Sequence, residues 1–249
     1  MRKKGRCTSQ VLGIKIDSTS MSGVLRNVKR WIESNRGKRY MVTPNPEMVV
    51  LAQRDKQFLR VLNRADLAIP DGVGLRLADK RLRRVAGVDL VAELIKLAAK
   101  KGWRVMLLGG RPGVAVKAAE RWQGGNKGLL VAALAGPQRI ERVSAAENSR
   151  LIERINQFKP DLLLVGFGHG KQEKWIAKNL ARLKVKVAMG VGGAIDILAQ
   201  PWKRAPKLCQ CLGLEWLWRL LLQPWRLRRQ LALVKFVWLV VIRERVGYE

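Results

Sequence analysis

The stretch KPDLLLVGFGHGKQEKWIAKNL, residues 159–180, decides the fold, because it passes from an apolar run through a glycine-rich turn into a segment with helical spacing. A short run of Leu and Val that ends in glycine is typical of a buried strand. The polar and apolar spacing after Lys171 indicates a helix. A strand that turns directly into a helix is the repeating unit of a parallel α/β sheet.

The same unit recurs along the chain. Apolar runs predict strands, and the segments between them predict helices. The strands are expected at 40–43, 67–69, 103–108, 129–134, 161–166 and 185–190, and the helices at 21–35, 46–64, 88–101, 113–123, 144–158 and 171–183. Residues 1–200 are therefore predicted to form a single Rossmann-like α/β domain with a mainly parallel sheet. Ligands of such sheets bind beyond the carboxyl ends of the strands, where TPNPE, PDGVG, GGRPG, GFGHGKQE and GVGGAID all begin.

The composition changes near residue 201. Strand signals stop, and five of the nine Trp residues fall within 201–249. We expect a basic, Trp-rich helical appendage there, which Pro224 kinks or divides. Its most apolar part, residues 231–242, is shorter than the roughly 20 residues that a membrane span needs, so the segment is expected to lie on a membrane surface and not to cross it.

The formal net charge of +30, from 49 Lys and Arg against 19 Asp and Glu, predicts anionic partners. Nucleic acid, anionic lipid and phosphorylated substrates all fit this charge. Residues 1–200 hold 39 basic and 16 acidic side chains, and residues 201–249 hold 10 and 3. The basicity is therefore spread along the chain, and a generally basic host proteome explains it as well as a dedicated binding face does.

The cysteine and histidine content argues against a metal site. Three cysteines form no Cys-x-x-Cys pair, and His169 is the sole histidine. The basic N-terminus is followed by Lys15 and Asp17 instead of a continuous apolar run, which disfavours a secretory signal. A reduced, cytoplasmic compartment is expected.

Two loops near the start of the sheet carry candidate site residues. TPNPE places Thr43 and Asn45 at a strand end, where they can bind substrate or simply cap the next helix. ADLAIPDGVGL places Asp71 after an apolar strand, with glycines that allow close approach of a substrate. A lone carboxylate there suits a general base, although an Asp in a turn also serves local hydrogen bonding.

The later strand ends are rich in glycine. GGRPGV offers Gly109, Gly110 and the start of a helix to a phosphate, but it lacks the dinucleotide-binding pattern. GVGGAID sets Gly192 and Gly193 beside Asp196, where a base or ribose can rest on the backbone or where the turn simply packs tightly.

The loop GFGHGKQE carries His169, Lys171, Gln172 and Glu173. A lone loop histidine without a paired nucleophile or acid is more often incidental than catalytic. Lys171 and Gln172 are the candidates for binding substrate at this strand end.

Together and in this order, the motifs resemble those of the WecG/TagA/CpsF glycosyltransferase family, also called glycosyltransferase family 26. The resemblance covers nearly the whole chain from about residue 11. It rests on TPNPE, ADLAIPDGVGL, RRVAGVDL, LLGGRPGVA, KPDLLLVGFG..KQEKWIAKN, MGVGGAIDILA..WKRAPK and GLEWLWRLL..PWR.

The resemblance implies an inverting transfer without metal or other cofactor, often of N-acetylmannosamine from UDP to undecaprenyl-diphosphate-N-acetylglucosamine, in wall teichoic acid or related polymer synthesis. It also implies a peripheral enzyme on the cytoplasmic face of the cell membrane. Another hexose donor, such as glucose, galactose or a mannosaminuronic acid, remains an alternative. The sequence leaves the oligomeric state open, and a homo-oligomer is compatible with it.

Matching the family motifs residue by residue implies roles for single side chains. Asp71 is expected to be the general base. Thr43, Asn45 and Gln172 are expected at the sugar, Arg84 at the charged groups and Asp196 at the nucleoside. His169-Gly170 departs from the small residue and proline that family members commonly have before KQE, which leaves the donor sugar open.

The appendage carries Arg219, Arg226 and Arg229, which fall on one side of a continuous helix. The family resemblance implies that they cover the active site while Trp and Leu meet an anionic membrane. Ordinary packing on the domain is the alternative. A nucleic-acid-binding protein would explain the charge, but two Tyr, four Phe and no recognisable recognition fold disfavour it. A membrane scaffold without catalysis is disfavoured by the presence of Asp71 and Gln172.

Overall fold

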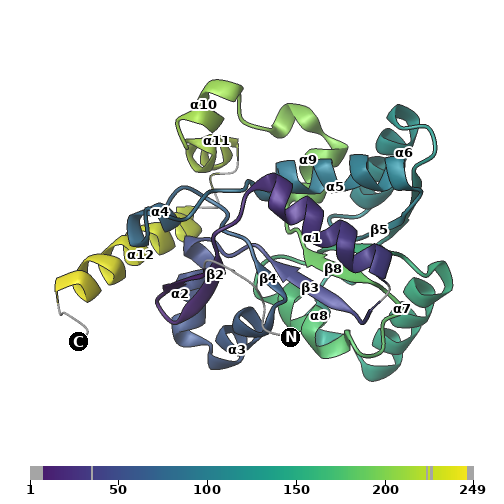
Figure 1. The fold of residues 1–249 in the computed structure, drawn as a ribbon, viewed down its shortest axis with the longest axis horizontal. Coiled ribbons are helices and arrows are strands. Elements are labelled where there is room, and N and C mark those ends of the chain that lie inside the picture. Colours follow the sequence, from purple (N-terminus) through teal and green to yellow (C-terminus); the bar gives the residue numbers. More distant parts are fainter. Residues whose placement is uncertain (1–7, 35, 223, 225–226, 246–249) are drawn as a thin grey trace.

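The protein is described by a computed structural model that covers residues 8–34, 36–222, 224 and 227–245 (Figure 1). Its centre is a six-stranded sheet in the order β4-β3-β8-β7-β5-β6, in which every neighbouring pair is parallel. The strands are β3 Arg39–Val42, β4 Leu67–Ala68, β5 Arg104–Gly109, β6 Leu130–Leu134, β7 Leu162–Gly166 and β8 Val187–Gly190. All six predicted strands are present, which confirms the α/β, Rossmann-like fold class.

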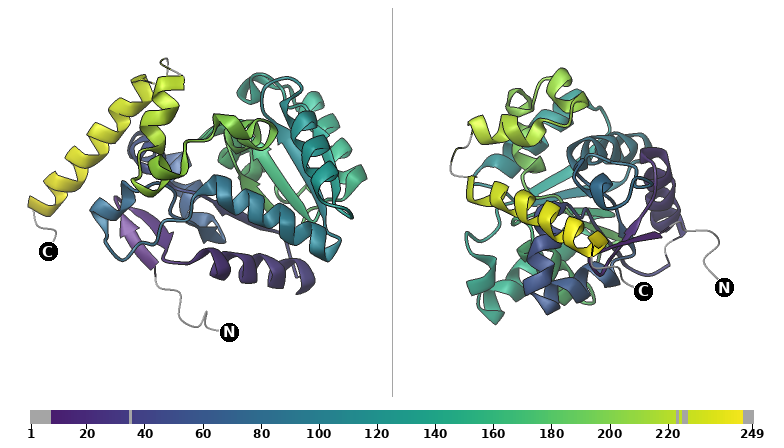
Figure 2. Two further views of the ribbon diagram at one scale, coloured as in Figure 1. Left: turned by 90° about the horizontal axis from the view of Figure 1, so that it is seen from above. Right: turned by 90° about the vertical axis from the view of Figure 1, so that its left-hand side faces the viewer.

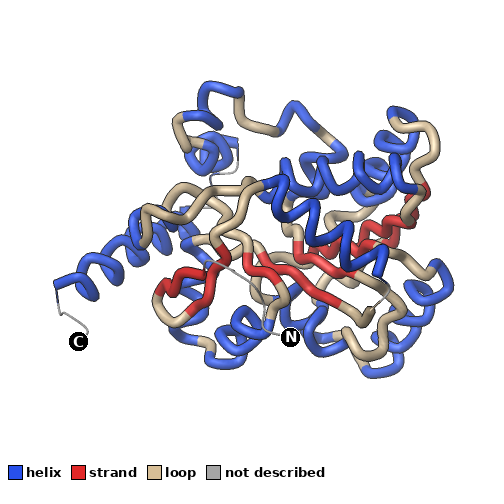
Figure 3. The backbone as a smooth tube through the Cα atoms, in the orientation of Figure 1, coloured by secondary structure: helices blue, strands red, loops and turns tan. Residues whose placement is uncertain are grey.

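Helices cover both faces of the sheet (Figures 1 and 3). Alternation along each strand supplies both faces with apolar side chains: Met106 and Leu108 belong to one core, and Val105 and Leu107 to the other. The first core is covered by α2 Pro46–Arg54, α3 Lys56–Arg64, α7 Ala145–Phe158 and α8 Lys171–Asn179. The second is covered by α1 Met21–Ser34, α5 Gly87–Lys101, α6 Val114–Gly125 and α9 Ala194–Ala199.

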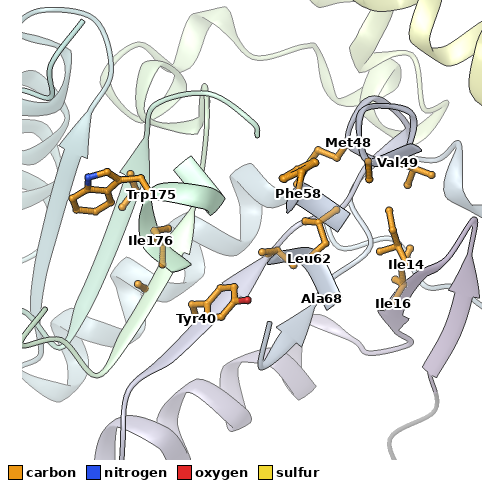
Figure 4. Close-up of a cluster of buried hydrophobic side chains, with 14 of the residues drawn as sticks. Ile14, Ile16, Tyr40, Met48, Val49, Phe58, Leu62, Ala68, Trp175 and Ile176 are labelled. Carbon is orange, nitrogen blue, oxygen red and sulfur yellow. The ribbon is translucent and has the colours of Figure 1, made fainter. Parts of the chain in front are cut away.

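The predicted helix at 46–64 is two helices, α2 and α3, that meet at Asp55. This residue ends α2 and caps α3, because its Oδ1 accepts the Phe58 N–H at 2.9 Å. An Asp side chain competes for backbone N–H groups and so favours a helix start over a helix interior. The break turns α3 so that Phe58 and Leu62 enter the first core beside Met48 and Val49 of α2 (Figure 4).

A two-stranded antiparallel hairpin, β1 Thr8–Val11 and β2 Ile14–Asp17, precedes the sheet and has no counterpart in the predicted elements. Its turn consists of Leu12 and Gly13, with φ of 47° and 84°. Positive φ at both positions is usual for such hairpins, but Leu is rare there, so the sequence lacks the familiar Asn-Gly signal. The hairpin packs Ile14 and Ile16 onto the first core (Figure 4).

Beyond α9 the described chain is helical, with η2 Pro201–Lys203, α10 Lys207–Cys211, α11 Glu215–Leu222 and α12 Leu227–Arg245. Short α4, Leu75–Ala78, and η1, Ile140–Arg142, complete the elements. The helices α10, α11 and α12 gather at one end of the molecule (Figure 2). Phe236 and Val240 of α12 are buried in the first core, where α12 packs on α2. The sequence predicts a boundary between the α/β domain and the appendage at residues 200 and 201. This position lies between α9 and η2, and the division into two domains stays a proposal.

No helix in the described part of the chain is both long enough and apolar enough to cross a membrane. Exposed apolar side chains nevertheless concentrate after residue 201. They are Trp202, Leu208, Leu212, Trp216, Leu217, Leu221, Leu222, Leu231, Val234, Val237, Trp238, Val241 and Ile242, whereas the earlier described residues contribute only Val73, Leu77, Val116 and Leu130. Phe236 faces the core and Trp238 is 59% exposed, so α12 has one buried and one exposed apolar side.

Candidate functional site

The sheet topology gathers the candidate loops at one edge. The neighbouring strands β7 and β8 lead to α8 and α9, which lie on opposite faces, and β8 and β3 likewise lead to α9 and α2 on opposite faces. Where the loops after two neighbouring strands run to opposite faces of an open α/β sheet, they leave a crevice beyond the strand ends, and ligands bind there. The loops that carry Thr43, Asp71, Gly109, Gln172 and Gly192 all lie at this edge.

Asp71 lies between the TPNPE loop and the start of α5. Its backbone N–H donates to the Pro44 carbonyl at 2.8 Å, which joins the first two candidate loops. Its Oδ1 accepts the Gly87 N–H at 3.3 Å. The N-cap residue of α5, Ala86, makes no side-chain cap, so the carboxylate of Asp71 supplies an acceptor at the positive end of this helix.

The absence of a side chain at Gly87 gives the carboxylate of Asp71 room for this approach. A Cβ at Gly87 would lie 3.2 Å from Asp71 Oδ2, which is closer than most Cβ contacts. The residue before Asp71 is also held, because the Val85 N–H donates to the Pro70 carbonyl at 3.0 Å. The backbone N–H groups of Val85 and Gly87 therefore hold the Pro70-Asp71 segment.

Asn45 and Thr43 lie at the end of β3. Asn45 Oδ1 accepts the Met48 N–H at 2.9 Å and caps α2, which confirms the capping interpretation of this residue. Thr43 is buried. Their contacts with a sugar stay a prediction. In the first turn of α2, Glu47 Oε2 lies 3.7 Å from Nε2 of His169, which links this loop to the one before α8.

Arg84 joins the site to the appendage. Its Nη1 donates to the Gln210 carbonyl at 3.2 Å, and its Nη2 pairs with Glu215 of α11. Both side chains are largely buried, at 21% and 14% exposed. Arg84 Nε is buried and finds no hydrogen-bond partner within the described part of the chain. The sequence motifs predict no role for Glu215. Arg84 and Glu215 are far apart along the chain, and no pattern in a single sequence shows that they are in contact.

A second ion pair ties the appendage to the same place. Arg204 Nη2 lies 2.6 Å from Asp89 Oδ1 in the first turn of α5. The start of α5 is thus held by Asp71 on one side and by the chain after α9 on the other.

The third candidate loop, which follows β5, contacts the fourth and fifth loops, which follow β7 and β8. Gly110 N–H donates to the Gly166 carbonyl at 3.0 Å, and Arg111 Nε lies 3.4 Å from Asp196 Oδ1. Gly109 has a φ of 97°, and a Cβ there would lie 2.9 Å from the Gly166 carbonyl oxygen. Glycine is needed for this approach; binding of a phosphate or nucleoside here stays a prediction.

Gln172 is buried at the start of α8, at 3% exposed, and its amide is engaged on both sides. Nε2 donates to Glu173 Oε1 at 2.7 Å, and Oε1 accepts the Gly192 N–H at 3.0 Å. The predicted residues Gln172 and Gly192 are therefore in direct contact. Glu173 Oε2 accepts the Gly170 N–H at 2.7 Å.

Glu173 is fully buried, and this burial raises the pKa of its carboxyl to about 7 against the hydrogen bonds from Gln172 and Gly170. No role for Glu173 follows from the sequence motifs alone. The available signal is its place three residues after Gly170, the spacing of a capping box.

The remaining predicted residues lie apart from these contacts or outside the described residues. Lys171 Nζ pairs with Glu141 Oε1 at 2.7 Å on the surface, and Gly193 precedes α9 as its N-cap. Arg226 lies outside the described residues, as do the side chains of Arg219 and Arg229. Within the described residues, no three His, Cys, Asp or Glu side chains are grouped as metal ligands.

Comparison with known proteins finds that the Glycosyl transferase WecG/TagA/CpsF family model matches residues 9–249. Two similar proteins come from Staphylococcus aureus strains MRSA252 and NCTC 8325, and both are named N-acetylglucosaminyldiphosphoundecaprenol N-acetyl-beta-D-mannosaminyltransferase. Each is 30% identical over an alignment of 249 residues that covers 94% of this chain and 92% of the relative.

Proposed function

Because this chain belongs to the WecG/TagA/CpsF glycosyltransferase family, we propose that it transfers N-acetylmannosamine from UDP to undecaprenyl-diphosphate-N-acetylglucosamine, with inversion at the anomeric carbon. The observation that carries the proposal is the family match over residues 9–249, which includes every candidate loop. The names of the relatives specify an N-acetyl-beta-D-mannosaminyl group and a diphosphoundecaprenol acceptor, and these support the choice of sugar and acceptor.

In the proposed reaction Asp71 is the general base. It removes the proton from the acceptor hydroxyl as that oxygen forms a bond to the anomeric carbon. The bond from that carbon to UDP breaks on the opposite face, and its electron pair leaves with the diphosphate. A single displacement needs one base, whereas glycoside hydrolysis typically uses two carboxylates. The hydrogen bond from Gly87 supports this role, because it fixes the direction of the carboxylate.

The leaving diphosphate gains negative charge, which must be stabilised in the transition state. Arg84 and the starts of α6 and α9 are the proposed groups, since they lie at the same edge of the sheet. The buried Nε of Arg84 supports this assignment, because a buried donor without a partner is costly unless a ligand satisfies it. Thr43, Asn45 and Gln172 are proposed at the sugar, and Gly192 and Asp196 at the nucleoside.

We further propose that the appendage holds the enzyme peripherally on the anionic inner face of the cell membrane. Exposed Trp and Leu side chains of α11 and α12 support this, together with the basic residues of 201–249. Such a surface suits the boundary between headgroups and acyl chains. It would bring the proposed site to a lipid-linked acceptor.

A donor panel tests the proposal. Purified protein is incubated with a short-chain polyprenyl-diphosphate-N-acetylglucosamine and, separately, with UDP-linked N-acetylmannosamine, N-acetylglucosamine, glucose, galactose and N-acetylmannosaminuronic acid. Product masses are then measured. The N-acetylmannosamine donor is expected to give the fastest transfer. Faster transfer from another donor would retain the enzyme class and replace the sugar, whereas no transfer from any of them would reject the proposed substrates.

A further inference from the structure

The carboxyl group of Glu173 is used differently from that of another capping glutamate in this chain. At the start of α7, Glu147 accepts the Ser144 N–H and hydroxyl with Oε2, and the pair is exposed. At the start of α8, Glu173 caps Gly170 with Oε2 but is fully buried, and its other oxygen accepts from Gln172. Capping alone requires neither the burial nor the second contact.

The second contact sets the orientation of the Gln172 amide. An amide has one donor side and one acceptor side, so the bond from Nε2 to Glu173 turns Oε1 toward the Gly192 N–H. Gly190 lies directly against both side chains. A Cβ there would be 2.7 Å from Gln172 Nε2 and 2.7 Å from Glu173 Oε1, so a side chain at position 190 would displace the pair.

The acceptor side of Gln172 in turn fixes the turn between β8 and α9. Gly192 has a φ of 49°, in the left-handed region, and its N–H bond to Gln172 holds that conformation. The turn leads into α9, whose first turn carries Asp196.

We propose that Glu173 is a positioning residue of the transferase site, which acts through Gln172 to hold the Gly192 turn in the shape that receives the UDP-sugar. This rests on the proposed function, because Gln172, Gly192 and Asp196 belong to the proposed donor site. Glu173 itself touches no substrate. In its ionised form the carboxyl group accepts both hydrogen bonds, whereas a glutamine in its place can accept only one of them without turning its own NH₂ toward a donor.

The test compares wild type with Glu173→Gln, Gln172→Ala and the double variant, and uses Glu147→Gln as the matched capping control. Hydrogen exchange of the peptide that covers residues 187–199 reports the Gly192 turn without reference to activity. The KM for the UDP-sugar and the kcat report the site. We expect faster exchange in Glu173→Gln and a KM that rises on the order of tenfold, with a smaller change in kcat. Glu147→Gln should match wild type in all three measurements.

The double variant decides whether Glu173 acts through Gln172. If it does, Glu173→Gln adds no further rise in KM once Gln172 is alanine. The inference would be overturned if the KM of the double variant rose by the product of the two single-variant factors. Unchanged hydrogen exchange and unchanged KM in Glu173→Gln would also overturn it. If wild type transfers no sugar, the proposed function fails by itself, and the exchange comparison still decides whether Glu173 positions the turn.

Discussion

At the scale of single residues, backbone groups define the candidate site as much as side chains do. Asp71 is held by the N–H of Gly87, and Gln172 holds the N–H of Gly192. Both glycines lie where the backbone must come within hydrogen-bond reach of a functional side chain. Substitutions that keep side-chain volume but change hydrogen bonding are therefore the most informative variants of this protein.

Asp71→Asn is expected to lower kcat by at least about 100-fold, because the amide keeps the size of the carboxylate but cannot take the acceptor proton. UDP affinity, measured by titration calorimetry, should stay within about twofold of wild type, since the proposed base contacts the acceptor and not the nucleotide. Near-normal turnover of this variant at saturating substrate would remove Asp71 from the mechanism.

Glu173 is expected to make stability depend on pH. Its pKa of about 7 in the folded protein lies above the ordinary value of 4.5, so the folded state binds more protons than the unfolded state between these values and loses stability as pH rises through that range. The full loss is about 3 kcal/mol. Urea unfolding at pH 5 and pH 8 should show most of this loss in wild type relative to Glu173→Gln. An equal difference between the two proteins at both pH values would contradict it.

At the scale of elements, parallel strands are predictable from the sequence because buried strands are continuous apolar runs bounded by glycine or polar residues. All six were predicted, and so were the loops at their carboxyl ends. The hairpin β1–β2 was not, because Leu12 occupies a turn position that favours Asn or Gly. The break at Asp55 was missed because helical spacing continues across it.

Helix α12 offers two neighbouring apolar residues with different surroundings. Phe236→Ala is expected to lower the free energy of unfolding by about 3 kcal/mol, since Phe236 is buried against the first core. Trp238→Ala should change it by less than about 0.5 kcal/mol, because Trp238 is 59% exposed.

The two substitutions Phe236→Ala and Trp238→Ala should affect vesicle binding in the opposite order to stability. Trp238→Ala should reduce sedimentation with phosphatidylglycerol vesicles more than Phe236→Ala does, at a temperature where both variants are folded. Unchanged sedimentation of Trp238→Ala, together with Leu231→Ala and Val234→Ala on the same exposed side, would contradict a membrane role for α12.

At the scale of the whole molecule, the net charge indicates the kind of partner, whereas the long-range ion pairs show how the sheet is connected to the chain after α9. The charge of +30 predicted an anionic partner without naming it. The pairs Arg84–Glu215 and Arg204–Asp89 connect the sheet edge to the chain after α9. A single sequence could not predict these ion pairs. The chain holds many residues of the opposite charge for each partner, and the sequence does not show which of them lie close together. The assignment of Arg84 to the site was predicted only through the family resemblance.

The proposed reaction is expected to proceed without a metal ion, since Arg84 and the helix starts are proposed to stabilise the leaving diphosphate. Turnover in excess EDTA, which removes divalent cations, should equal turnover without it. Loss of activity in EDTA that Mg²⁺ or Mn²⁺ restores would assign the diphosphate to a metal instead.

The most direct measurement of the central claim follows both products of one reaction with wild-type enzyme, UDP-N-acetylmannosamine and polyprenyl-diphosphate-N-acetylglucosamine. UDP is quantified by chromatography and the lipid product by mass spectrometry. The account predicts one UDP for each lipid that has gained the mass of one N-acetylhexosamine. UDP release with free sugar and an unchanged lipid, or no UDP release at all, would contradict it.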